Sequence, residues 1–499
     1  MCVGMFMAIL DVQVVATSLP AIQGSLGIAP ELLSWLQTAY LIAEIIAIPL
    51  TGVLTRLLSI RWLFVVALSV FTLASIGCAS SSTVTTLLCW RVLQGFAGGT
   101  LIPSVFAAVF VLFPLRNQGL ATMLAGVLAV LAPTVGPVVG GWITQTYSWH
   151  WLFLVNVGPG VLAAIGAALL LPKGALERWV LRTLDWVALA LLAAALASLE
   201  IGLKEAPRHG WVSLQVVGLV CLAVACGLGF TWKSLTVAHP IVDLMTLKNP
   251  SFRVGCILSF ALGIGLFGSV YLMPVFLGFV RGHNPLEIGT IMLATGAAQL
   301  ATAPLAVFLE QKLNARVLSA AGFLLFGLGM ALSAFQTTQT DLAETFWPQI
   351  VRGIAIMFCL LPPTRLALGN LPLDKVPDAS GLFNLMRNLG GAVGLALIDT
   401  VIYGRAPIHA AAIAEQLSAG NSSVAASLGI PAALFASRAP GPLDASTQAL
   451  VAPLIEKLAL VQSINEAWML IAATTLGALV FVPFARPKTP ASVAILHSA

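Results

Sequence analysis

Long apolar runs, separated by short polar segments, follow one another along nearly the whole chain. A bilayer has a hydrocarbon core about 30 Å thick, which an α-helix crosses in about 20 residues. Each run of this length therefore predicts one membrane-spanning helix. We predict fourteen such helices, at residues 3–20, 32–54, 62–79, 84–113, 118–144, 151–171, 184–203, 212–232, 253–279, 288–309, 316–334, 346–370, 379–404 and 466–484.

The continuity of these runs favours helices over strands. A membrane β-barrel would show segments of about ten residues in which apolar and polar positions alternate. Hydrophobic residues make up 59% of the chain and charged residues only 9%, against about 25% charged residues in soluble domains. With a mean hydropathy of +0.99, the sequence predicts an all-α integral membrane protein.

The basic residues indicate orientation and not a nucleic-acid partner, because they are scattered over short connections and do not cluster on one face. With the N-terminus in the cytoplasm, most Lys and Arg residues fall on the cytoplasmic side, as is usual for inner-membrane proteins. Three of the outer ones, Arg405, Arg438 and Lys457, lie in one long loop. We predict a multi-pass protein of the cell inner membrane with both termini in the cytoplasm.

An internal repeat relates the two halves of the chain. Pro49 and Arg61 recur 255 residues later as Pro304 and Arg316, and other pairs recur at an offset of 258: Gly95 and Gly353, Pro114 and Pro372, Gly136 and Gly394. A shift of eight helices preserves orientation, so the repeat is parallel and predicts two six-helix bundles around a central cavity.

The repeat leaves one helix pair over and divides the chain into three parts. We predict a first bundle at 1–172, a linker with an inserted helix hairpin at 173–240, and a second bundle at 241–499. The second bundle includes a periplasmic loop at about 405–464 with Ala, Ser, Gly, Pro and some apolar positions. This loop is expected to be partly helical, and it either docks a partner or serves as a passive cover.

The sequence contains no motif for nucleotide or metal chemistry. A GxxxxGK[ST] phosphate loop is absent, the seven cysteines show neither zinc nor disulfide spacing, and no nucleophile constellation or soluble output domain is present. We therefore expect that the protein is not an enzyme and that it binds neither a metal nor a cofactor. The free energy for any transport must come from an ion gradient or from the substrate's own gradient.

Two carboxylates lie near the centres of predicted helices, Asp11 in the first and Glu44 in the second. A charged side chain there costs about 2.5–3.5 kcal/mol on insertion scales, so it is by default a functional hypothesis. A carboxyl group that alternates between dry and wet surroundings can bind and release a proton. We expect both to take part in proton coupling or substrate binding; alternatively, Asp11 caps a backbone or pairs permanently with an arginine.

Arginines also lie inside predicted spans. Arg91, in the fourth helix, needs an interior partner, which can be an acid or backbone oxygens. In the second half, Arg352 and Arg387 are candidates for the site, although Arg352 can reach an interface and Arg387 can be structural. Acidic residues would favour cationic substrates and arginines anionic ones, and the sequence leaves this choice open.

The fifth helix contains the segment APTVGPVVGGWI. Its glycines allow another helix to approach closely, and its prolines deform the helix axis. The residues that define this packing element are Pro133, Gly136, Pro137, Gly140 and Gly141.

Several of these segments resemble motifs of the major facilitator superfamily, in particular its fourteen-span drug:proton antiporter branch of the EmrB/QacA type. Leu10, Asp11, Leu19 and Pro20 resemble the LDxTxxNxALP motif, and Arg91, Gln94 and Gly95 resemble the RxxQG motif. The fifth-helix segment resembles the GPxxGG antiporter motif, which is associated with exporters. By this resemblance Arg91 and Gln94 join the candidate residues for proton transfer.

The connection between the second and third helices resembles the family's GxLaDRxGRrxxl loop only in Gly52, Leu54 and Arg61. Arg56 stands where the family has an Asp. The gating charge relay attributed to that Asp is therefore not carried over to this chain.

The resemblance implies a major facilitator fold of two six-helix bundles plus an inserted helix pair. It further implies a proton-coupled exporter of small amphiphilic or toxic molecules that uses alternating access, with a periplasmic adaptor and an outer-membrane channel as partners. The alternative is a dedicated carrier for one metabolite, for export or uptake, on the same fold.

Overall fold

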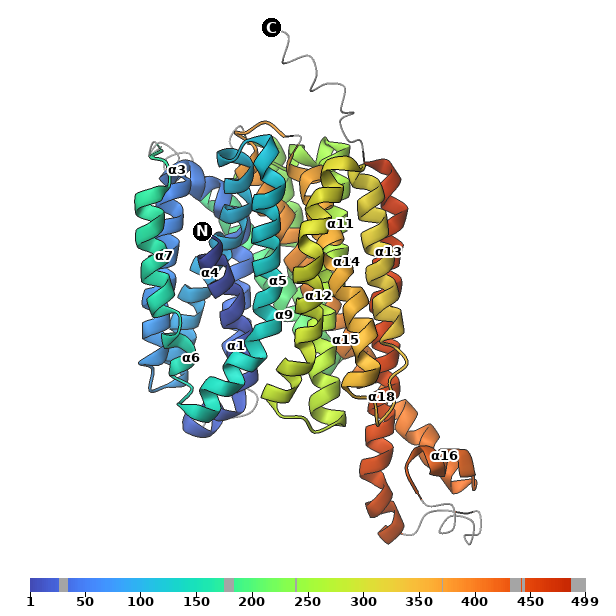
Figure 1. Cartoon of the computed structure of the whole chain (residues 1–499). Coiled ribbons are helices and arrows are strands. Elements are labelled where there is room, and N and C mark those ends of the chain that lie inside the picture. Colours follow the sequence, from blue (N-terminus) through green and yellow to red (C-terminus); the bar gives the residue numbers. More distant parts are fainter. Residues whose placement is uncertain are drawn as a thin grey trace.

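The computed structural model describes residues 1–26, 35–174, 184–237, 240–369, 371–430, 441 and 445–485 (Figure 1). At positions 16–21, 24, 115, 130, 134, 137, 285, 445 and 446 the description covers the backbone alone. Over these ranges the chain is helical and contains no strand. The predicted all-α fold is therefore confirmed.

The first half of the chain forms long helices joined by short connections. Its elements are α1 (Cys2–Leu26), α3 (Trp35–Ala79), α4 (Val84–Leu112), α5 (Leu115–Thr146), α6 (Trp151–Leu154) and α7 (Val157–Leu170). The predicted inserted hairpin corresponds to α9 (Trp186–His209) and α10 (Leu214–Thr236).

The second half begins with a short 3₁₀ helix and continues as a second set of long helices. Its elements are η1 (Leu244–Lys248), α11 (Pro250–Val275), η2 (Phe276–Val280), α12 (Pro285–Lys312), α13 (Ala315–Leu332), α14 (Leu342–Leu368), α15 (Val376–Ser418), α16 (Ser422–Ser427), α18 (Ala445–Gly477) and η3 (Ala478–Phe484).

Eleven helices in the described residues are long and apolar enough to span a membrane, or twelve when the bent helix α5 counts as one span. The helix α3 is 45 residues long and contains the second and third predicted spans, and α1 carries a shorter apolar stretch, Cys2–Val15. The predicted fourteen spans are compatible with this arrangement.

The helix α3 reverses direction at Ser59, where the backbone leaves helical geometry with φ 66° and ψ 160°. We call the end of the bundle that contains this turn the bend end; it is the upper end in Figure 1. At the opposite end, the end of α15, α16 and the start of α18 protrude beyond the other helices as an arm. We call this the arm end.

The arm is built from the segment that the sequence predicted to be a partly helical loop. Both α15 and α18 continue past the bundle, and Ile413, Leu417, Val451 and Ile455 bury apolar surface between them. Residues 431–440 and 442–444 of this segment lie outside the described part. The arm is therefore a helical hairpin with an apolar core of its own.

The two halves meet along two seams. The helix α5 packs on α12, and α15 packs on α3 and α4. The helix α9 contacts α3 of the first half and α15 of the second. Lys204 and Arg208 follow the predicted span 184–203, but they belong to α9, because the helix continues to His209 after its apolar run ends. The division into parts at 172 and 240 stays a prediction.

Candidate functional site

A buried polar cluster connects α1, α4 and the start of α7. Nη1 of Arg91 lies 2.5 Å from Oδ2 of Asp11. The side-chain amides of Gln94 and Asn156 donate hydrogen bonds to Oδ1 of Asp11 at 3.0 and 2.8 Å. The side chains of Asp11 and Arg91 have no exposed surface. The structure thus brings together three residues that the sequence selected.

Arg91 makes further contacts in the same interior. Its Nε donates to the carbonyl oxygen of Leu36 at 3.1 Å, its Nη1 donates to Oε1 of Gln94 at 2.8 Å, and its guanidinium lies 4.4 Å from the centre of the Tyr40 ring. Its partners therefore include an acid, an amide and a backbone carbonyl. This geometry favours the permanent-pair alternative for Asp11, because removing either partner would leave a buried, uncompensated charge.

Sequence reasoning missed two members of this cluster, Asn156 and Ser75. Asn156 bonds Asp11, and Oγ of Ser75 accepts a hydrogen bond from Nε2 of Gln94 at 2.9 Å. The only signal for Asn156 was a single amide inside the apolar stretch WLFLVNVG. Its role depends on the approach of α7 to α1, which the sequence pattern does not reveal.

A second site lies between the two halves, where a cavity of about 80 Å³ is bounded by both bundles. Its wall is mainly apolar, and its polar lining comes from Gln13 and Glu44 of the first half and Arg387 and Asn388 of the second. Sites for small molecules are usually about 300–1,000 Å³. In this conformation the halves have closed on a cavity too small for such a ligand.

Glu44 and Arg387 line the cavity from different halves of the chain. Nη2 of Arg387 donates to Oδ1 of Asn384, and its guanidinium lies 5.5 Å from the centre of the Phe106 ring on α4. Arg387 thus extends from the second half toward the first. Of the two predicted carboxylates, Glu44 lines the cavity, whereas Asp11 is enclosed in the first half.

The predicted packing element of α5 lies next to the cavity. Pro133 lines it, and a Cβ at Gly136 would collide with the side chain of Gln13. The axes of the two parts of α5, Arg116–Pro133 and Val138–Thr146, differ by 47°. Gly140 and Gly141 are buried, and the side chain of Pro137 lies outside the described part.

The loop residues Gly52 and Arg56 lie at a contact between the halves. Nη1 of Arg56 lies 2.5 Å from Oδ2 of Asp378 at the start of α15. A Cβ at Gly52 would collide with the same carboxylate. The sequence selected Arg56 but gave no signal for Asp378, which lies 322 positions away.

Two other candidates lie away from the cavity. Nη1 of Arg61 donates to the carbonyl oxygen of Leu171 at 3.4 Å, which joins α3 to the end of α7. Arg352 is buried in the second half with its guanidinium 4.7 Å from the centre of the Trp468 ring. Neither is part of the cavity lining.

Comparisons with known proteins agree with this architecture. Residues 1–395 match the Major Facilitator Superfamily. The chain is 39% identical, over 84% of its length and 82% of the relative's, to the colistin resistance protein EmrB of Acinetobacter baumannii. It is 29% identical to the multidrug export protein EmrB of Escherichia coli K12, over 97% of this chain and 93% of that protein.

Among solved structures, the human organic anion transporter MFSD10 has the same fold, with a TM-score of 0.59 at 14% identity. The match covers 96% of this chain and 97% of that structure.

Proposed function

The chain belongs to the major facilitator superfamily, and we propose that it is a proton-coupled multidrug exporter of the inner membrane. The observation that carries the proposal is the central cavity, in which Glu44 and Arg387 face a mainly apolar space from opposite halves. The names of the relatives support the direction, since they are export and resistance proteins.

Glu44 is the carboxylate to which we assign proton coupling. It lines the space that must open and close, so its surroundings change between wet and dry as the halves rock. A proton and a substrate then compete for the same group. One charge that crosses 100 mV is worth about 2.3 kcal/mol, enough for roughly a fifty-fold gradient of a neutral substrate.

Asp11 and Arg91 have a different role in this proposal. Their ion pair and its amide partners hold α1 against α4, so that the first half moves as a rigid unit. The family resemblance placed Arg91 in proton transfer; the enclosed geometry instead supports a structural role.

The arm end faces the periplasm in this proposal, and the bend end faces the cytoplasm, where we also propose that both termini lie. The basic residues of the short connections support this orientation. Export of amphiphilic molecules then proceeds from the bend end to the arm end.

We further propose that the arm binds a periplasmic adaptor, which leads substrate to an outer-membrane channel. Between α15 and α18 the arm has a groove of about 410 Å³. Ala410, Ala414 and Ile455 form apolar parts of its lining, and Glu415 and Glu456 contribute carboxylates. Such a groove fits a partner surface with apolar and basic side chains.

The first test is a susceptibility panel in a pump-deficient bacterium with two membranes. It contains colistin, ethidium and benzalkonium, and compares wild type with Glu44→Gln and with Glu205→Gln, a control on α9 that does not line the cavity. We expect wild type and the control to protect against at least one compound and Glu44→Gln to lose protection. Protection by Glu44→Gln equal to wild type would remove Glu44 from the mechanism.

If neither wild type nor any variant protects the cells, although all are expressed normally in the membrane, a dedicated carrier for one metabolite is favoured.

The arm is tested separately by filling its groove with Ala414→Trp and comparing Ala426→Trp, an exposed position on α16 outside the groove. We expect Ala414→Trp to abolish resistance in cells but to preserve ethidium uptake by everted inner-membrane vesicles. Equal resistance with both variants would contradict adaptor binding at this groove.

A further inference from the structure

The inserted helix α9 contacts both halves near the arm end. Nζ of Lys204 donates to Oγ1 of Thr38 on α3, and it lies 4.9 Å from the centre of the Trp35 ring. Just beyond α9, Nε1 of Trp211 donates to Oγ1 of Thr400 on α15 at 3.0 Å. The inserted hairpin is thus in a position to respond to the relative movement of the halves.

One turn before Lys204, α9 carries Glu200, a carboxylate that the sequence reasoning did not select. Its Oε2 is shielded from solvent and has no hydrogen-bond partner. No ion pair within 4.0 Å involves Glu200 among the described residues. The side chain as a whole is only partly buried, but a carboxylate oxygen that is shielded from water and has no partner is costly when charged, so Glu200 is suited to binding a proton.

The register of α9 against α3 places Glu200 near Glu44. The two helices run in opposite directions, and Lys204 meets Thr38 near the arm end. From that contact, Glu200 is four residues and Glu44 six residues toward the bend end, which is about 6 Å and 9 Å along the helices. Glu44 is within electrostatic range of Glu200. Two carboxylates therefore lie at a similar depth on facing helices.

The other charged groups near Glu200 and Glu44 bond other residues or lie across the cavity. Lys204 is the cation near Glu200, and its ammonium bonds Thr38. Around Glu44 lie Asp11 and Arg91, which pair with each other, and Arg387 across the cavity. On α15, which also packs on α9, Asp399 accepts a hydrogen bond from Tyr271 at 2.8 Å, with Arg208 within electrostatic range.

We propose that Glu200 of the inserted hairpin is a second proton-binding site that exchanges protons between the arm-end water and Glu44. A proton from water neutralises the Glu200 carboxylate, then passes to the Glu44 carboxylate and leaves Glu200 charged again. This inference deepens the proposed function and rests on it for the role of Glu44. It assigns the hairpin a part in coupling, beyond that of a spacer between the halves.

The test is infrared difference spectroscopy of the full-length protein in liposomes, titrated from acidic to alkaline pH without substrate. The variants are Glu200→Gln, Glu44→Gln, the double variant and Glu205→Gln, which changes a carboxylate five residues further along α9. We expect each of the first two to remove one protonated-carboxyl band and to shift the titration midpoint of the remaining one. The double variant lacks both bands, and Glu205→Gln leaves both in place.

The inference would be overturned if the two carboxyl groups titrate independently, so that each single variant leaves the other band unmoved. It would also be overturned if Glu200→Gln loses no band. The variant Glu200→Asp keeps a carboxylate at this position and separates loss of the proton site from loss of packing. We expect it to restore the mutual shift.

Ethidium transport driven by an imposed pH gradient, in the same liposomes, tests the proposed function separately. Wild-type protein that moves no ethidium, while its two carboxyl bands remain coupled, would count against the exporter proposal for this dye and leave the Glu200 site standing. If wild-type protein transports ethidium but its two carboxyl bands titrate independently, the exporter proposal stands and the Glu200 inference fails.

Discussion

Nη1 of Arg56 lies 2.5 Å from Oδ2 of Asp378, and this ion pair joins α3 of the first half to α15 of the second at the bend end. Close by, Oγ of Ser380 donates to the carbonyl oxygen of Pro103 on α4 at 2.9 Å. These contacts must break if the halves separate at this end. The basic partner of this pair comes from the first half and the acidic partner from the second.

Breaking the Arg56–Asp378 pair should favour opening at the bend end. Arg56 is 33% exposed, so solvent screening limits the contribution of the pair to about 1 kcal/mol, roughly a fivefold change in the open population. We expect Asp378→Asn to increase bend-end opening, Arg56→Asp to increase it further by like-charge repulsion, and the exchange of both residues to restore closure. The distance between spin labels on α3 and α15 measures this. A double exchange that opens as widely as Arg56→Asp would contradict a charge-based contact.

The Asp11–Arg91 pair should govern stability more than transport direction. Because both side chains are fully buried, replacement of one partner leaves a charge in dry surroundings, at a cost of about 3–5 kcal/mol. We expect Asp11→Asn and Arg91→Gln to lower the thermal stability of the purified protein strongly, while Glu44→Gln changes it little. A comparable loss for Glu44→Gln would contradict the separation of the structural and coupling roles.

Ser59 is strained where α3 bends. Its φ of 66° with ψ of 160° belongs to a region that glycine alone occupies readily, and such strain costs about 1–3 kcal/mol. Oγ of Ser59 is also buried without a hydrogen-bond partner. We expect Ser59→Gly to raise the melting temperature, whereas Ser59→Ala, which keeps the Cβ, provides the control for loss of the hydroxyl. An equal effect of both variants would argue against backbone strain.

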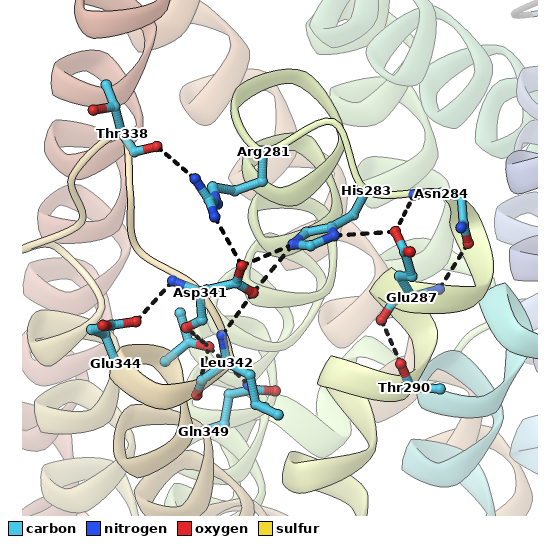
Figure 2. Close-up of polar contacts among 11 residues, drawn as sticks. Arg281, His283, Asn284, Glu287, Thr290, Thr338, Asp341, Leu342, Glu344 and Gln349 are labelled. Carbon is cyan, nitrogen blue, oxygen red and sulfur yellow. Dashed lines mark hydrogen bonds and ion pairs between the residues drawn. The ribbon is translucent and has the colours of Figure 1, made fainter. Parts of the chain in front are cut away.

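A polar cluster at the arm end should make stability depend on pH (Figure 2). Nη2 of Arg281 donates to Oδ2 of Asp341 at 3.0 Å, and the imidazole of His283 lies between Asp341 and Glu287. The hydrogen bond from Arg281 holds the pKa of Asp341 below its ordinary value of 3.8. The charged carboxylate of Asp341 therefore stabilises the fold fully when the pH is above 3.8, and this stabilisation is lost as the pH falls through the lowered pKa.

We expect Asp341→Asn to reduce stability by up to about 1 kcal/mol at neutral pH, because the partly exposed group is screened by solvent. The difference from wild type should shrink in acid. Thermal unfolding over a pH series measures this. A constant difference down to pH values well below 3.8 would show that the effect of the variant does not come from the carboxylate charge.

The sequence alone determined the spanning helices and the family, for physical reasons that are local. A membrane span requires about 20 consecutive apolar residues, and apolar runs of this length can be read directly from the sequence. It also selected Asp11, Glu44, Arg91 and Arg387, because a charge in an apolar run is conspicuous without any knowledge of neighbours.

Only the tertiary structure decided which of these charges meet. Asp11 and Glu44 look alike in sequence, yet packing of α1 against α4 encloses the first with Arg91, while the seam between the halves exposes the second to the cavity. Arg56 finds Asp378 across 322 positions, and α9 brings Glu200 near Glu44. Such contacts depend on how helices pack, and hydropathy sets the length of a helix but not the neighbour that each of its faces will meet.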